Sequence, residues 1–517
     1  MPRRNTKRRK RGKPVRAEGN DDSLPIDSAF LNQSSTELLT DSYRGDCGDE
    51  KRQEFETAVP FPYAALPELV QPEFLNLVRK ELLSKQGSRE DPPIEFRLRR
   101  NDLYHFFQSA DLGKLLEDES VSKQVPHLCK LRDVLFGEEF RAYIKSLTGI
   151  TTTGQVDLFA SVYADTHRLL CHDDNMGTRR VAFILYLVDD EWSEAEGGQL
   201  ALHAAREDGM PENRPEKLLV PKFNQLACFA VSTKSFHQVM EVTLDQKKVR
   251  PRLAVGGWLH GEPLENSRDA MTEEMVEICE NCNDVSFDSF NEAEVAEWLH
   301  KDYCGADTTK QIAEHFAQEG HVFLEQALKK EVWQKLRKEI EQIQWNEQGP
   351  PLLHLFDKAT QLPPTWTRLR AFLHSDTFAS LLHRWTMCEP VNARSVVRRF
   401  SQGHYVLQSD TARQFAHPGL DVTLYLTPPS VREWQEDWGG VTHYVDSEEE
   451  LLNVTPSSNS LIIVYRDDAE VMPFVDFVNH HARYSVLDMH VKLDTNEVPD
   501  SESDSNDEDD EDEAAEE

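Results

Sequence analysis

The chain has 517 residues, of which 39% are hydrophobic and 29% charged, and its formal net charge at pH 7 is −35. This length allows two or three domains with substantial cores. The longest purely apolar run, residues 181–188, is far shorter than the ~20 residues of a membrane span, so no membrane association is expected. No apolar segment typical of a secretory signal follows the N-terminus, and we expect an intracellular protein.

The two ends of the chain carry opposite charge. Residues 3–13 (RRNTKRRKRGK) hold eight basic and no acidic residues, which favours a nuclear localisation signal or a nucleic-acid arm over a merely solvated end. Residues 500–517 hold twelve acidic residues and are too charged to fold. Without these twelve acidic and eight basic residues the body still carries −31, so we expect it to repel nucleic acid and to prefer basic partners.

The eight cysteines are scattered, which favours free thiols in a reducing compartment. Cys279 and Cys282 form a lone CxxC, and only Cys304 follows nearby. A zinc site would require a second pair of ligands. The sequence therefore favours a coincidence in a linker over a metal or redox site.

One structural unit occurs twice along the chain. The segment LRDVLFGEEFRAYIKSLTG (131–149) resembles LRAFLHSDTFASLLHRWTM (369–387), and residues 74–85 resemble residues 332–343. Further on, AFILYLV (182–188) matches DVTLYLT (421–427), and Gly197-Gly198 matches Gly439-Gly440. All four matches keep the same order, which indicates a duplication.

Each unit begins with helical periodicity and continues as short strands, over about 150–262 in the first and 395–495 in the second. This pattern predicts an α+β protein whose two sandwiches or jelly-roll barrels carry helices outside. We expect a disordered basic N-terminus (1–50), a first domain (51–262), an acidic linker (263–289), a second domain (290–497) and a disordered acidic tail (498–517).

The motif His-x-Asp occurs three times, and its context separates the copies. His300 and His374 lie in helical patterns, where residues i and i+2 point to different sides. His172 and Asp174 directly precede the apolar run, and in an extended strand such a pair shares one face. Only this copy is expected to chelate a metal; the alternative is a polar turn before a buried strand.

A third ligand should come from a strand that is distant in sequence, and His237 lies between two β-prone segments. Two histidines and one carboxylate leave coordination positions open, as in non-haem Fe(II) oxygenases, whereas zinc is more often four-coordinate and closed. A 2-oxo acid cosubstrate would need a cation for its far carboxylate, and Arg252 on the next β segment suits this role. An ordinary polar cluster is the competing interpretation.

The motifs CHDDN, RRVAFILYLV, EGGQL, FHQVMEV and RLAVGGWLHG together resemble the eukaryotic ribosomal prolyl 3-hydroxylases, a family of 2-oxoglutarate- and iron-dependent oxygenases. The resemblance covers nearly the whole chain. It implies a catalytic double-stranded β-helix (jelly-roll) domain, followed by a second, non-catalytic one. It also implies O2 as cosubstrate, with ascorbate as a further candidate, and 3-hydroxylation of a proline in a small-subunit ribosomal protein at the decoding centre.

The resemblance assigns roles to individual residues and partners. Carried over by motif, the iron ligands would be His172, Asp174 and His237, and the 2-oxoglutarate pocket would comprise Arg252, Tyr186, Tyr163 and Leu169. Leu169 and Tyr163 could equally be plain core residues. Translation termination factors, an effect on termination accuracy, stress granules, and a location in nucleus and cytoplasm come with the family.

Two departures stand out. The family commonly has Arg-x-Ser where this chain has Arg252-Leu253-Ala254, so one hydroxyl contact to the cosubstrate is missing, and Arg250 is a less suitable competitor for the arginine role. In the second unit, Gln408 and Asp410 align with the first metal pair, and His480 and His481 lie near the place of the distal ligand. The alternatives are an oxygenase of the same fold acting on another protein or on nucleic-acid bases, and a non-enzymatic scaffold.

Overall fold

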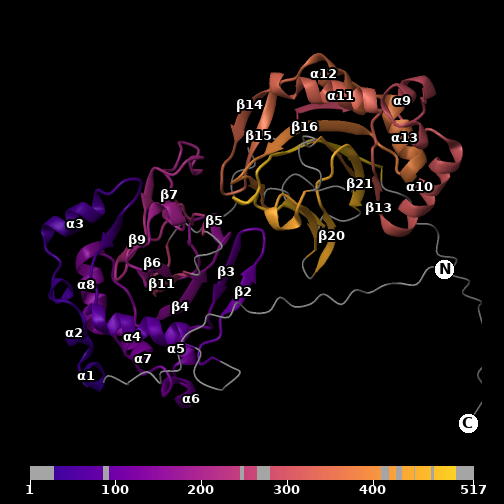
Figure 1. Cartoon of the computed structure of the whole chain (residues 1–517). Coiled ribbons are helices and arrows are strands. Elements are labelled where there is room, and N and C mark those ends of the chain that lie inside the picture. Colours follow the sequence, from indigo (N-terminus) through magenta and orange to yellow (C-terminus); the bar gives the residue numbers. More distant parts are fainter. Residues whose placement is uncertain are drawn as a thin grey trace, which may run out of the picture.

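The structure is a computed structural model of the whole chain, and it describes residues 28–84, 92–244, 250–264, 280–408, 419–426, 434–446, 449–466 and 471–496. These residues form two units, each built around one curled sheet in which neighbouring strands run antiparallel (Figure 1). The helices of each unit lie on the side of its sheet that faces away from the other unit (Figure 1). No helix in the described ranges is long and apolar enough to cross a membrane.

The first sheet takes its strands from along the whole first unit. In spatial order they are β1 (Tyr63–Leu66), β9 (Leu226–Ala230), β6 (Arg179–Tyr186), β11 (Arg252–His260), β4 (Val156–Tyr163), β3 (Tyr104–Gln108), β5 (Arg168–His172), β10 (His237–Val239), β7 (Leu200–Leu202) and β8 (Lys217–Leu219), while β2 (Arg97–Arg100) pairs with β3. Neighbouring strands are thus often far apart in sequence, which brings residues from distant segments to one face.

The second sheet repeats this order. Its strands are β13 (His321–Leu324), β21 (Ser460–Arg466), β18 (Gly419–Tyr425), β23 (Val486–Asp494), β16 (Asn392–Phe400), β15 (His354–Gln361), β17 (Tyr405–Val406), β22 (Met472–Val475), β19 (Thr442–Val445) and β20 (Glu450–Val454). In addition, β14 (Gln344–Gln348) pairs with β15, as β2 does with β3, and β12 (Glu280–Asp284) pairs with β16. The strand-by-strand match confirms the predicted duplication.

The helices of the first unit cover one face of its sheet. They are α1 (Ser28–Leu31), α2 (Ser35–Leu38), α3 (Asp49–Glu56), α4 (Pro72–Leu83), α5 (Leu112–Leu115), α6 (Glu119–Ser122), α7 (Pro126–Phe136) and α8 (Glu138–Thr148). Leu38 and Tyr43 are buried in this helix–sheet core, so the ordered unit begins well before residue 51, where the sequence analysis placed its start.

The second unit is covered in the same way by α9 (Glu292–Trp298), α10 (Ala306–Glu319), α11 (Lys330–Glu339), α12 (Pro364–Leu373) and α13 (Asp376–Thr386). The predicted pairs of helices recur, since α7 and α8 correspond to α12 and α13. Both α8 and α13 end in a left-handed residue, Gly149 in one and Met387 in the other. The strands, however, start earlier than expected, because β1 to β3 lie before residue 150.

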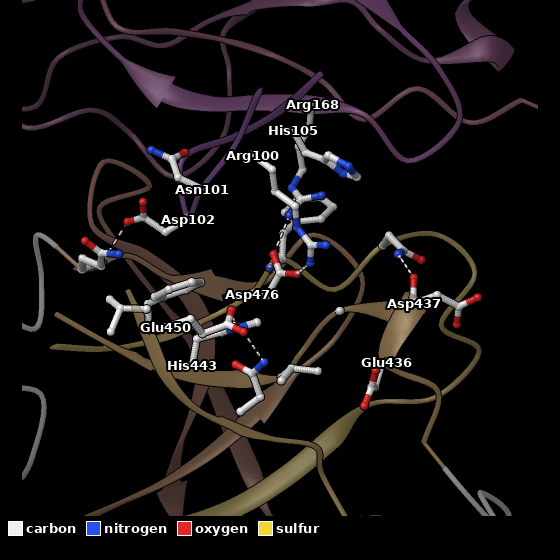
Figure 2. Close-up of a pocket in the computed structure, with 18 of the residues that line it drawn as sticks. Arg100, Asn101, Asp102, His105, Arg168, Glu436, Asp437, His443, Glu450 and Asp476 are labelled. Atoms are coloured by element: carbon white, nitrogen blue, oxygen red, sulfur yellow. Dashed lines mark hydrogen bonds and ion pairs between the residues drawn. The ribbon is translucent and has the colours of Figure 1, made fainter. Parts of the chain in front are cut away.

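The two units contact each other behind β5. Leu170 of this strand packs with Tyr405, Leu407 and Phe477 of the second unit. Beside this apolar contact, Arg168 Nη2 donates to Asp476 Oδ1 at 2.7 Å, and Arg100 Nη2 lies 3.3 Å from Asp476 Oδ2 (Figure 2). A cleft of about 700 Å³ opens next to this ion pair.

Several expectations fall on residues outside the described ranges. They concern the basic segment 3–13, the acidic tail 498–517, most of the linker, Cys279 and Asp410. Cys282 is exposed, and Cys304 is half-buried with its thiol directed to the His300 carbonyl.

Candidate functional site: a two-histidine, one-carboxylate cluster

The structure brings His172, Asp174 and His237 together. His172 is the last residue of β5 and His237 the first of β10, and the two residues face each other in the antiparallel ladder. The distances from Asp174 are 3.5 Å between Oδ1 and His172 Nε2, and 3.3 Å between Oδ2 and His237 Nε2. The three side chains can therefore hold one metal ion.

Backbone carbonyls fix the orientation of both imidazoles. His172 Nδ1 lies 2.8 Å from the Leu170 carbonyl, and His237 Nδ1 lies 2.8 Å from the Ser235 carbonyl. Because a carbonyl only accepts, each Nδ1 carries the proton, and each Nε2 presents its lone pair to the cluster. This is the arrangement that orients histidine ligands in metal sites.

Asp174 does not continue the strand, as the sequence argument assumed. It follows β5 with a φ of +62°, a left-handed conformation that aspartate adopts more readily than most residues. The strand conformation therefore accounts for the direction of His172 only. The Asp174 side chain reaches the cluster because the chain turns after β5. Burial opposes ionisation here, but the neighbouring His237 and His172 hold the pKa of the Asp174 carboxyl well below its usual range.

Arg252 lies behind the cluster at the start of β11, where it pairs with Tyr163 on β4. Its guanidinium carbon is 4.8 Å from the centre of the Tyr163 ring and 5.1 Å from that of Tyr186. Only 1% of Arg252 is exposed, and its Nε donates to the Gly198 carbonyl at 2.7 Å. Burial raises the pKa of both tyrosines, so their hydroxyls stay protonated.

The polar atoms of this pocket fit an anion. Arg252 Nη2 and the Tyr186 hydroxyl are buried, close to each other, and make no well-formed hydrogen bond with the part of the chain that the structure describes. A buried donor without an acceptor is costly, and a carboxylate would satisfy both groups. The residues present therefore fit a 2-oxo dicarboxylic acid that reaches from the metal cluster to Arg252.

The cavity between these groups has a volume of about 120 Å³. Leu169 lines it, as do apolar side chains including Phe106, Phe229 and Val239. The Phe106 ring stacks on Tyr163 with centroids 4.7 Å apart. Of the four cosubstrate residues expected from the sequence, Tyr163, Leu169 and Arg252 line this cavity. The fourth, Tyr186, does not line it but contacts Arg252.

The sequence did not predict two further residues near the cluster: Trp258, which lines the cavity, and Arg179, which packs on Trp258. Trp258 shares the inner face of β11 with Arg252, at an even spacing that could have identified it. The guanidinium carbon of Arg179 lies 3.6 Å from the Trp258 ring centre, and its Nη1 lies 3.8 Å from Asp174 Oδ1. By strict alternation along β6, the Arg179 side chain would point to the face opposite the cavity. A register shift at the end of the β6–β11 ladder interrupts this alternation at Arg179.

Other candidates lie elsewhere. Arg250 pairs with Glu196 at 2.8 Å and also contacts Glu191, which leaves the arginine role to Arg252. Ala254 is buried on β11 and offers no hydroxyl. His300 caps a short 3-10 helix, and His374 ends α12, so both lie at helix ends rather than inside helices. Neither belongs to a metal-holding cluster among the described residues.

The second unit carries different residues at the corresponding positions. On β10, Val239 pairs with Leu200, which lies two residues after Gly198. On β22, Val475 pairs with Thr442, which lies two residues after the matching Gly440. His237 therefore corresponds to Pro473, and not to His480 or His481, which lie further along the chain. The Leu187 N–H donates to the Leu253 carbonyl, and the equivalent Leu426 N–H donates to the Leu487 carbonyl. Leu253 therefore corresponds to Leu487, and the preceding residue, Arg252, corresponds to the buried Val486.

Each unit matches a known family model. Residues 158–260 match the family model described as the 2OG-Fe(II) oxygenase superfamily. Residues 291–502 match the model described as the oxoglutarate and iron-dependent oxygenase degradation C-terminal domain. The boundary between the matches agrees with the two sheets.

Whole-chain relatives are also found. The chain is 29% identical to prolyl 3-hydroxylase OGFOD1 of Xenopus laevis, over 89% of this chain and 91% of the relative. It is 28% identical to the Mus musculus protein of the same name, over 82% and 85% of the two chains. It is 27% identical to prolyl 3,4-dihydroxylase OGFOD1 of Ostreococcus tauri, over 84% and 95%.

Proposed function

We propose that the chain is a 2-oxoglutarate- and iron(II)-dependent oxygenase, and that it acts as a prolyl 3-hydroxylase on a small-subunit ribosomal protein. The observation that carries the proposal is the alignment of the His172–Asp174–His237 cluster, the cavity and the buried Arg252. The names of the relatives support prolyl hydroxylation, and the family match supports the use of Fe(II), 2-oxoglutarate and O2.

Each residue has a defined task in this proposal. His172, Asp174 and His237 bind Fe(II) on one side and leave its remaining coordination positions toward the cavity. Arg252 binds the far carboxylate of 2-oxoglutarate through a charge-assisted pair, assisted by the Tyr186 hydroxyl. When bound, iron and 2-oxoglutarate together supply the oxidation of a substrate C–H bond by O2. The apolar wall that includes Leu169 and Phe106 keeps water out of the cavity.

The substrate side of the cavity is formed by Trp258, against which Arg179 packs. The Trp258 indole next to the metal cluster suits a proline ring, which is compact and apolar, and Arg179 stacked on the indole can donate to a peptide carbonyl. The negative charge of the body favours a basic substrate such as a ribosomal protein by steering association.

The inter-unit cleft adds to this preference, because it is lined by more acidic than basic side chains (Figure 2). The acidic ones are Asp102, Glu436, Asp437, Asp446, Glu449, Glu450 and Asp476, against Arg100 and Arg168. A nucleic acid would need a basic track instead. This charge distribution argues against the base-modifying alternative.

The second unit is proposed to be non-catalytic. Pro473 cannot ligate a metal, and Val486 cannot bind a carboxylate, so the two functions of the first unit have no counterpart at these positions. Its role would be to support the first unit and position the substrate. Action in nucleus and cytoplasm, contact with termination factors, an influence on termination accuracy and on stress granules, and a requirement for ascorbate all belong to this proposal.

The test is peptide mass spectrometry of the candidate ribosomal protein after incubation with enzyme, Fe(II) and 2-oxoglutarate. We expect added oxygen on one proline with the wild type and none with His172→Ala. His300→Ala is the matched control, because it removes the histidine of another His-x-Asp pair and should leave the product unchanged. One or two added oxygens would distinguish hydroxylation from dihydroxylation.

Three other outcomes would change the proposal. Consumption of 2-oxoglutarate without modification of this protein would keep the oxygenase and reject the substrate. Oxygen added to a nucleic-acid base would favour the alternative substrate class. No turnover with iron bound would favour the scaffold, whose binding should survive removal of iron by a chelator.

A further inference from the structure

A second group of two histidines and one aspartate lies at the contact between the units, away from the proposed active site. It consists of Asp165, in the connection between β4 and β5, and of His480 and His481, between β22 and β23. We propose that these three side chains bind a divalent transition-metal ion, for which Zn²⁺ is the natural probe, and that the ion joins the two units.

The spacing of the three groups resembles that of the first cluster. His480 Nε2 lies 3.3 Å from Asp165 Oδ1, and His481 Nε2 lies 2.7 Å from Asp165 Oδ2. In the first cluster the histidine–carboxylate distances are 3.5 and 3.3 Å. Ligands placed 2.0–2.1 Å from a tetrahedral Zn²⁺ lie about 3.3 Å from one another. The His480–Asp165 distance already has this value, His481 would move outward from Asp165, and the three ligand atoms all lie within 4.8 Å of one another.

A carboxylate outside the three ligands orients His480. Glu241 Oε1 lies 2.9 Å from His480 Nδ1 and also accepts the His480 backbone N–H at 2.9 Å. A carboxylate that holds Nδ1–H leaves the Nε2 lone pair aimed at the site, and this carboxylate–histidine–metal relay is typical of metal sites. In its neutral form, His480 would otherwise point that lone pair directly at the Asp165 carboxylate, which is also an acceptor.

Charge and access also suit a cation. Asp165 and Glu241 bring two negative charges to the cluster, and Arg168, which interacts electrostatically with Glu241, is already paired with Asp476. The side chains of His480 and His481 are 20% and 29% exposed, so an ion can enter and keep a water molecule as its fourth ligand.

The position of the site gives it a structural consequence. Asp165 lies three residues before β5, which ends in His172, and Glu241 follows β10, which begins with His237. Histidines from the second unit therefore reach the loops of both strands that carry the proposed iron ligands. An ion bound here needs both units and would hold them together behind the active site.

The test is a count of tightly bound Zn²⁺ on full-length protein that has been stripped with a chelator, reloaded with Zn²⁺ and passed over a desalting column. The background is His172→Ala, which removes the first cluster, and we expect it to retain one Zn²⁺ per chain. Adding Asp165→Asn or His481→Gln should abolish this binding. Adding His315→Gln, an exposed histidine of the second unit, should not.

A second measurement separates binding from misfolding. Zn²⁺ should raise the Tm of the His172→Ala protein, because it binds only when the units are docked, and this rise should vanish with His481→Gln. Equal Tm values of these proteins in chelator would show that both are folded. The proposal is wrong if His172→Ala retains no Zn²⁺. The cluster would then be explained by a protonated His480 that bridges the carboxylates of Asp165 and Glu241. It is also wrong if Zn²⁺ binding survives His481→Gln, since the ligands would then lie elsewhere in the chain.

Discussion

Arg252 illustrates how a single residue can be assigned from both charge and burial. A guanidinium that is 1% exposed is expensive to bury, and the described partners satisfy only part of its donor capacity. The remaining donors face a cavity that ends at the metal cluster. Such a residue contributes little to folding and is best explained by an anionic ligand.

We predict that Arg252→Ala weakens 2-oxoglutarate binding by about 100-fold, because two charge-assisted hydrogen bonds of ~1.5 kcal/mol each are lost. Tyr186→Phe removes one hydrogen bond to the carboxylate, worth ~1.5 kcal/mol, and should cost about 10-fold. The measurement is the dependence of turnover on 2-oxoglutarate concentration, together with iron binding, which should not change. An unaltered concentration dependence in Arg252→Ala would refute the assignment.

At this scale the sequence predicted the residues better than their conformations. Residue type and spacing were sufficient for His172, His237 and Arg252, since strands with alternating faces bring them together. The left-handed backbone of Asp174 could not be predicted from the sequence, because aspartate occurs in many conformations. Arg179 was missed for a related reason, since a register shift in a ladder cannot be read from one strand.

At the scale of elements, the turn before β7 holds Arg252 in place. Gly198 has a φ of +68°, and its carbonyl accepts from Arg252 Nε. A Cβ at this position would lie 2.6 Å from Arg252 Cδ and 3.1 Å from Val242 Cγ2. The glycine is therefore needed for space as well as for backbone conformation.

Gly198→Ala should displace the Arg252 side chain and raise the KM for 2-oxoglutarate about 10-fold or more, while iron binding is retained. Gly209→Ala is the matched control, since Gly209 also has a positive φ, of +80°, but its Cβ would meet nothing within 4 Å. Both variants carry a similar backbone strain of ~1–2 kcal/mol. Steady-state kinetics measure the KM for 2-oxoglutarate of both variants, and equal values for Gly198→Ala and Gly209→Ala would contradict the prediction.

The order of elements was predictable where a unit was long and periodic, and unpredictable where it depended on a distant partner. The repeated helices and the β6 and β18 strands were found by comparing the chain with itself. By contrast, β1 has four residues and pairs with β9, more than 150 positions later. Nothing local distinguishes such a segment from a loop, because the distant partner supplies its hydrogen bonds.

At the scale of the whole molecule, one buried carboxylate links the units. Asp476 of the second unit is 8% exposed and faces Arg168 and Arg100 of the first, with His443 nearby. Burial alone would raise its pKa, but the two arginines hold the pKa of the carboxyl below its usual value of 3.8. This contact could not be predicted from the sequence, because Arg168 and Asp476 lie 308 positions apart.

We predict that Asp476→Asn lowers the free energy of unfolding at pH 7 by ~3 kcal/mol, because Arg168 remains buried without its counter-charge. A carboxyl whose pKa is lowered by folding stabilises the protein above its unfolded pKa and loses this contribution as the pH falls through the folded value. The difference between wild type and variant should therefore be constant from about pH 7 to pH 5 and shrink below pH 3.8. Urea titrations at each pH measure it, with the exposed Asp437→Asn as a control that should change stability by less than ~0.5 kcal/mol. A difference that persists undiminished in acid would show that Asp476 acts through packing rather than charge.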